Sequence, residues 1–128
     1  FTEPGGLASI ADARTAYDTA DLRDRLGKYH IKVDNCFRGW NDSWLHLDFQ
    51  EWNVSDCLDY IRVPVLAIQG HDDQYGTMAQ IDEVVDRCYA PVDVLAIEDC
   101  RHAPHVDAPQ TTLDGIADFC RRLADINA

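Results

Sequence analysis

Two short polar loops of the sequence carry side chains that can perform acid–base chemistry. Residues 70–77 contain the adjacent carboxylates Asp72 and Asp73, and residues 98–109 contain the imidazole of His102. A carboxylate that accepts a hydrogen bond from Nδ1 of a histidine fixes the tautomer of the ring, and it stabilises the imidazolium that forms when Nε2 takes a proton. These residues therefore predict two members of a nucleophile–base–acid triad, with the acid before the base in the chain.

Both loops follow segments that are predicted to be strands. Residues 63–68 form an apolar, β-branched run with Pro64 near its start and Gly70 shortly after its end. This pattern is typical of a strand buried on both faces. Residues 92–97 form a second such run, and helices are predicted between the two strands and after Pro109. This strand–helix–strand–helix order predicts a parallel pair whose loops leave the same edge of the sheet. The last helix is expected to pack its apolar residues inward, namely Leu113, Ile116, Ala117, Cys120 and Leu123.

The part of the chain before residue 62 is predicted to be entirely helical. Ser55 can cap a short helix over residues 56–61. We therefore expect an α/β protein of two pieces, a tryptophan-rich helical segment over residues 1–61 and a βαβα portion over residues 62–128. Apolar residues recur in the helical segment at spacings of three and four, at Leu7, Ile10 and Tyr17, at Leu22, Leu26 and Tyr29, and at Val33, Phe37, Trp40 and Trp44.

The composition argues against several classes of partner. The chain has 128 residues with 11 basic and 23 acidic side chains, and its formal net charge of −12 makes nucleic acid and anionic membrane surfaces poor partners. No apolar run approaches the roughly 20 residues that a membrane span needs. Five cysteines at wide spacing, without a CxxC pair, indicate free thiols in a reducing compartment, so we expect a cytoplasmic protein. Because the chain starts at Phe1 rather than at Met, we also expect it to be part of a longer protein.

The two loops resemble motifs of the α/β-hydrolase superfamily. Residues 63–77, VPVLAIQGHDDQYGT, are similar to the late strand of that fold, where a Gly-x-x-Asp turn presents the triad acid. Residues 100–109, CRHAPHVDAP, are similar to its histidine loop, usually Gly-His-x-Pro-His-x-acid-x-Pro, with Arg101 in place of the first glycine. Residues 37–45, FRGWNDSWL, look like the lid helices that precede this strand.

The resemblance implies a fold and a reaction. The helical segment would be the lid, and the βαβα portion would be the C-terminal part of the hydrolase core. Matched to the motifs, Asp73 is the triad acid and His102 the base. The family's reaction is hydrolysis of an ester, amide or related bond by a serine nucleophile, with no metal or cofactor implied. Trp40 and Trp44 would contact a small substrate of apolar or aromatic character.

The chain lacks the nucleophile of that family. Its three serines, Ser9, Ser43 and Ser55, all lie outside any Gly-x-Ser-x-Gly elbow. The resemblance therefore implies a fragment that is inactive alone. Its expected partners are the small-molecule substrate of the full-length parent and the missing N-terminal half, or a second copy that joins through the sheet edge.

The residues leave other interpretations open. Asp72 is a rival of Asp73 for the acid, and a phosphoacceptor carboxylate at this position would call for a Lys after the next strand, where the sequence has Glu98-Asp99 instead. A zinc or iron site could combine His102-x-x-His105 with either carboxylate, although a Pro-containing loop does not place both rings on one helical face. A function of another class is a non-catalytic binding or self-assembling module with an exposed sheet edge.

Overall fold

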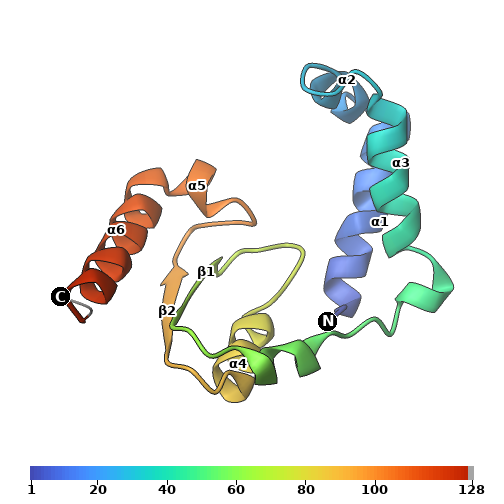
Figure 1. Ribbon diagram of the computed structural model, residues 1–128. Coiled ribbons are helices and arrows are strands. Elements are labelled where there is room, and N and C mark those ends of the chain that lie inside the picture. Colours follow the sequence, from blue (N-terminus) through green and yellow to red (C-terminus); the bar gives the residue numbers. More distant parts are fainter. Residues whose placement is uncertain (127–128) are drawn as a thin grey trace. The chain divides into compact units, whose positions relative to one another are not determined.

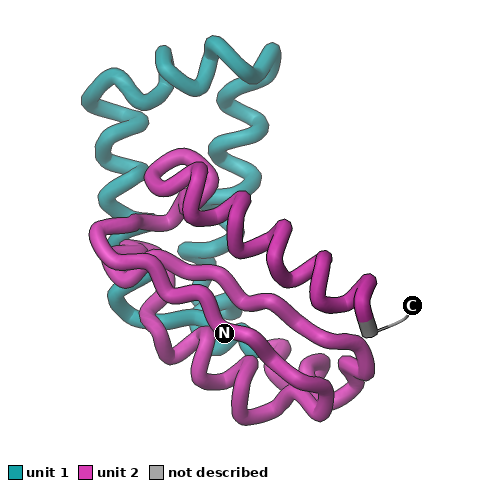
Figure 2. Tube along the Cα trace, turned by 90° about the vertical axis from the view of Figure 1, so that its left-hand side faces the viewer, with its two compact units in different colours: residues 1–53 teal, residues 54–128 magenta. Residues whose placement is uncertain are grey.

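The computed structural model describes residues 1–126 and has a mixed α/β architecture with a two-stranded parallel sheet and flanking helices. The chain divides into two compact units, which we call the helical unit (residues 1–53) and the sheet unit (residues 54 onward) (Figure 2). Among the described residues, no helix is both long enough and apolar enough to cross a membrane.

The helical unit contains three α-helices around a small aromatic core. They are α1 (Pro4–Thr19), α2 (Leu22–Gly27) and α3 (Val33–Trp44), followed by the short 3-10 helix η1 (Leu47–Phe49). Figure 1 shows α1 and α3 side by side. The ring of Tyr17 stacks on that of Phe37 with centroids 3.8 Å apart, and Val33 completes the buried cluster. The helices predicted from the spacing of apolar residues are confirmed, except that Tyr29 lies beyond the end of α2 and is exposed.

Polar side chains also join α1 to α3. The buried amide of Asn41 donates from Nδ2 to the carbonyl of Ile10 at 2.8 Å, and its Oδ1 accepts from Nε of Arg14 at 2.6 Å. Because every buried polar group needs a partner, this amide specifies how the two helices pair.

The sheet unit has the predicted strand–helix–strand–helix order, with one further short helix before the last. It contains the 3-10 helix η2 (Ser55–Tyr60), β1 (Val65–Gly70), α4 (Ala79–Arg87), β2 (Val92–Ile97), α5 (Pro104–Asp107) and α6 (Pro109–Ile126). The strands pair in parallel from Val65 opposite Val92 to Gly70 opposite Ile97. Figure 1 shows α4 and α6 on opposite sides of this pair.

The division between the units falls earlier than the boundary expected after residue 61. The reason is that η2 packs on α4 through the guanidinium of Arg87. Its Nη1 lies 2.6 Å from Oδ1 of Asp56, and its Nε lies 2.9 Å from Oε1 of Glu83 on the same helix.

Helix α6 presents a different face to the sheet from the one expected. Of the five residues expected to point inward, four are exposed and Leu123 is partly buried; the exposed ones are Leu113, Ile116, Ala117 and Cys120. Thr112 is buried instead, and a Cβ at Gly115 would lie 2.5 Å from Cδ2 of Leu95. The missing side chain at this glycine leaves room for the end of the Leu95 side chain against α6.

Candidate functional site

The acid loop starts where β1 ends, at Gly70, and crosses the histidine loop at close range. A Cβ on Gly70 would overlap the carbonyl group of Cys100 and would lie 2.5 Å from the carbonyl oxygen of Arg101. Glycine is required here because the two backbones leave no space for a side chain.

Hydrogen bonds join the start of the acid loop to β2, to the histidine loop and to the end of the acid loop itself. The N–H of His71 donates to the carbonyl of Ile97 at 2.9 Å, which extends the sheet ladder by one residue. The N–H of Asp72 donates to the carbonyl of Cys100 at 2.9 Å. The amide of Gln69 donates to the carbonyls of Gly76 and Thr77 at 2.7 and 2.9 Å.

The histidine loop is shaped by a turn and a short helix. Asp99 adopts a φ of 51°, in the left-handed region that Asp tolerates better than most residues. The N–H of Arg101 donates to Oδ2 of Asp107 at 3.0 Å, which closes the loop around α5. Helix α5 lies within the segment that the sequence predicts to be a loop. The signal for this helix is Pro104, since Pro suits the first turn of a helix.

These constraints bring Asp73 and His102 together. Nδ1 of His102 lies 3.0 Å from both carboxylate oxygens of Asp73. The side chain of Asp73 is 10% exposed, whereas that of His102 is 58% exposed. A largely buried carboxylate behind an accessible imidazole holds the proton on Nδ1 and leaves Nε2 for a reacting group. Within residues 1–126, nothing hydrogen-bonds to Nε2 of this histidine.

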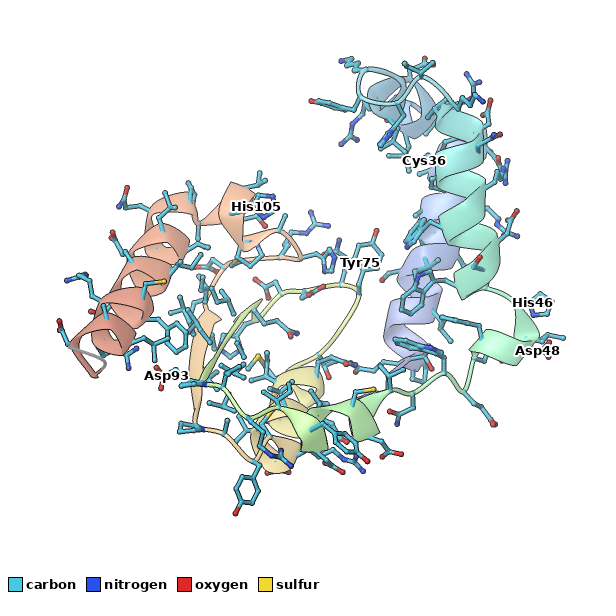
Figure 3. All side chains as sticks on the ribbon, viewed as in Figure 1. Cys36, His46, Asp48, Tyr75, Asp93 and His105 are labelled. Atoms are coloured by element: carbon cyan, nitrogen blue, oxygen red, sulfur yellow. The ribbon has the colours of Figure 1, made fainter. Side chains whose placement is uncertain are left out.

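Tyr75 contacts both members of this pair. Its backbone N–H donates to Oδ1 of Asp73 at 2.8 Å, and its ring lies edge-on to that of His102, with centroids 4.9 Å apart and planes at 79°. Figure 3 labels Tyr75 on the loop between β1 and α4. The sequence gives no direct indication of this role; its signal is the place of Tyr75 two residues after Asp73.

The other polar candidates of the two loops lie apart from this pair. Asp72 is exposed, and neither of its carboxylate oxygens bonds His102. His105 is exposed on α5 (Figure 3), and Nε2 of His71 lies 3.3 Å from Oε1 of Glu98. No group of three or more His, Cys, Asp or Glu side chains in the described part of the chain is arranged to hold a metal ion.

The thiol of Cys100 lies in the same loop but is suited to packing rather than reaction. The residue is fully buried, and burial raises the pKa of its thiol, with the carboxylates of Asp107, Asp72 and Asp73 adding to the shift. Because the thiolate is the nucleophilic form of cysteine, this environment disfavours nucleophilic chemistry at Cys100.

The serines lie on elements that do not offer a nucleophile. Ser9 is in α1, and Ser43 is in α3, where its hydroxyl donates to the carbonyl of Gly39 at 2.6 Å. Ser55 is buried at the start of η2. None of them follows a strand, which is where an elbow would present a nucleophile.

Trp40 and Trp44, expected to contact substrate, both belong to the helical unit. Trp40 is 37% exposed and packs edge-on against Phe37 at 5.7 Å between centroids. Trp44 is half-buried in an aromatic cluster with Phe49 and Trp52, with centroids 5.2 to 5.7 Å from its own. Their substrate contact stays a prediction.

Known proteins do not decide the family of this chain. No protein-family model matches it, and no curated protein matches it. The geometry of the Asp73–His102 pair and the motifs around it therefore carry the functional argument.

Proposed function

We propose that this chain supplies the acid and the base of a serine-type α/β-hydrolase. The observation that carries the proposal is the placement of Nδ1 of His102 at 3.0 Å from both oxygens of Asp73, with the acid largely buried and the base accessible. The two loops that hold the pair leave adjacent parallel strands at the same end, which is where open α/β sheets place their functional groups.

In the first half of the proposed reaction, His102 accepts a proton and then donates it. Its Nε2 takes the proton of a serine hydroxyl as the serine oxygen bonds to the substrate's carbonyl carbon. It then gives that proton to the leaving group as the scissile bond breaks. Water hydrolyses the acyl-enzyme by the same transfers in reverse order, while Asp73 holds the ring and stabilises its charged form.

The proposed reaction requires catalytic groups that this sequence does not supply. The nucleophilic serine and the oxyanion donors would come from a longer protein of which the chain is part, and the sheet unit would be the C-terminal portion of its core. The helical unit would then serve as the lid. Trp40 and Trp44 would contact a small ester or amide with an apolar or aromatic group, in a cytoplasmic enzyme.

The test begins with the coding sequence upstream of Phe1. A Gly-x-Ser-x-Gly motif after a strand is expected there, and the longer protein should hydrolyse aryl esters. His102→Ala in that protein should lower kcat/KM by at least about 10³-fold, while His105→Ala should change it less than about threefold. A His102→Ala variant that hydrolyses esters at the parent's rate would show that His102 is not the catalytic base.

A second candidate function is a binding or self-assembling module, and the surface of the sheet unit favours it. In the part of the chain that the structure describes, each strand has only one strand neighbour. Val94 on β2 and Leu113 and Ile116 on α6 are exposed. Unpaired strand edges and apolar faces favour association. Sedimentation of the purified 128-residue chain should show a concentration-dependent dimer or larger species. A folded monomer at all concentrations would exclude self-assembly through these surfaces.

A further inference from the structure

We propose that Tyr75 is a positioning residue that sets the direction of Nε2 of His102. This inference rests on the proposed role of the Asp73–His102 pair. It concerns a residue that contacts both members of the pair, one through its backbone and the other through its ring.

The backbone contact fixes the acid. The N–H of Tyr75 donates to Oδ1 of Asp73 at 2.8 Å, two residues along the chain, which is the geometry of an Asx turn. Oδ1 therefore lies within hydrogen-bond distance of two donors, the N–H of Tyr75 and Nδ1 of His102. A carboxylate held in this way presents a fixed acceptor to the imidazole.

The ring contact fixes the base. The hydrogen bond to Asp73 holds Nδ1, but the imidazole can leave this position by rotation about its Cα–Cβ and Cβ–Cγ bonds. The side chain of His102 is 58% exposed, so surrounding atoms do little to stop that rotation. The ring of Tyr75, at 4.9 Å between centroids and 79° between planes, supplies a second point of contact. The two contacts together restrain these rotations, and with them the direction of Nε2.

The contact to His102 is made by the aromatic ring, so the ring rather than the hydroxyl should carry the effect. Tyr75→Phe keeps the ring and the backbone N–H, whereas Tyr75→Leu keeps only the N–H and a similar apolar bulk. This pair of variants separates ring contact from packing. An edge-on aromatic contact corresponds to about a two- to tenfold change in a local equilibrium.

The experiment uses the 128-residue chain with ¹⁵N-labelled histidine. In the parent chain we expect a downfield Nδ1–H proton on His102, ¹⁵N shifts of the Nδ1–H tautomer, and a nuclear Overhauser effect between the rings of Tyr75 and His102. Tyr75→Leu should raise the solvent-exchange rate of that proton about two- to tenfold and shift the ¹⁵N signals toward a tautomer mixture. Tyr75→Phe should change the solvent-exchange rate by less than about twofold and should leave the ¹⁵N signals close to those of the parent chain.

The outcomes separate the two proposals. A parent chain without the Nδ1–H signal overturns the Asp73–His102 pair, and the role of Tyr75 with it. A signal that is present in the parent and unchanged in Tyr75→Leu overturns only the positioning role. If Tyr75→Leu does not fold, the ring-to-ring Overhauser effect in the parent decides, since its absence rules out the contact.

Discussion

The backbone of Gly70 passes so close to that of Cys100 that no side chain fits between them. This approach, together with the hydrogen bond from the N–H of Asp72 to the carbonyl of Cys100 at 2.9 Å, joins the acid loop to the histidine loop. The Asp73–His102 pair depends on it, because each residue sits only a few positions beyond the crossing.

Gly70→Ala should therefore destabilise the sheet unit by about 2 kcal/mol or more, since the added Cβ meets backbone atoms that cannot move aside easily. Gly39→Ala is the matched control. A Cβ at Gly39, within α3, meets nothing within 4 Å, so that change should stabilise the helical unit by about 0.5–1 kcal/mol. Urea unfolding followed residue by residue in amide NMR spectra measures both. Equal stability of Gly70→Ala and the parent would contradict the close approach.

Asp73→Asn and Asp72→Asn should differ strongly in the longer protein that the proposed function requires. An asparagine at 73 cannot hold the proton on Nδ1 of His102 as a carboxylate does, so kcat should fall by about 10⁴-fold. Asp72→Asn should change kcat less than about threefold, because no bond joins that carboxylate to the imidazole. Aryl-ester hydrolysis measures both variants, and the reverse ranking would make Asp72 the acid.

The helical unit should lose stability in acid through Asp34. Two hydrogen bonds from Arg23 and one from the hydroxyl of Tyr17 lower the pKa of Asp34 to about 2. Because the folded-state pKa lies below the ordinary value, the carboxylate stabilises the fold fully above about pH 4 and loses this effect as the pH falls toward 2.

Tryptophan fluorescence measures this acid effect directly, since the three tryptophans of the chain, Trp40, Trp44 and Trp52, all belong to the helical unit. In Asp34→Asn, the part of the pH dependence between about pH 4 and 2 should disappear. An unfolding curve with the same pH dependence in the parent and the variant would show that Asp34 does not contribute.

Leu113→Glu tests whether another element covers α6. Leu113 is 61% exposed, so in the 128-residue chain the change should cost less than about 0.5 kcal/mol. In the longer protein the same change should cost about 2 kcal/mol or more if the added strands bury this face. Ile81→Ala is the buried comparison and should cost about 2–5 kcal/mol at either length. If Leu113→Glu lowers the free energy of unfolding by the same small amount in both proteins, this face of α6 is exposed in both.

The sequence alone predicted what depends on neighbours along the chain. The spacing of Val33, Phe37, Trp40 and Trp44 predicted α3, and the apolar runs predicted both strands, because helix and strand periods are local properties. The strand–helix–strand order also predicted that the acid loop and the histidine loop would meet.

Only the tertiary structure decided which side chains touch. Asp72 and Asp73 are adjacent and chemically alike, yet only Asp73 lies within 3.0 Å of the imidazole, because contacts across the loop crossing set where each carboxylate lies. The contact of Tyr75 with His102 likewise cannot be predicted from the spacing of residues in the sequence. The periodicity that places Leu113 and Ile116 on one face of α6 could not tell whether anything covers that face, because burial depends on what packs against a helix and not on the helix itself.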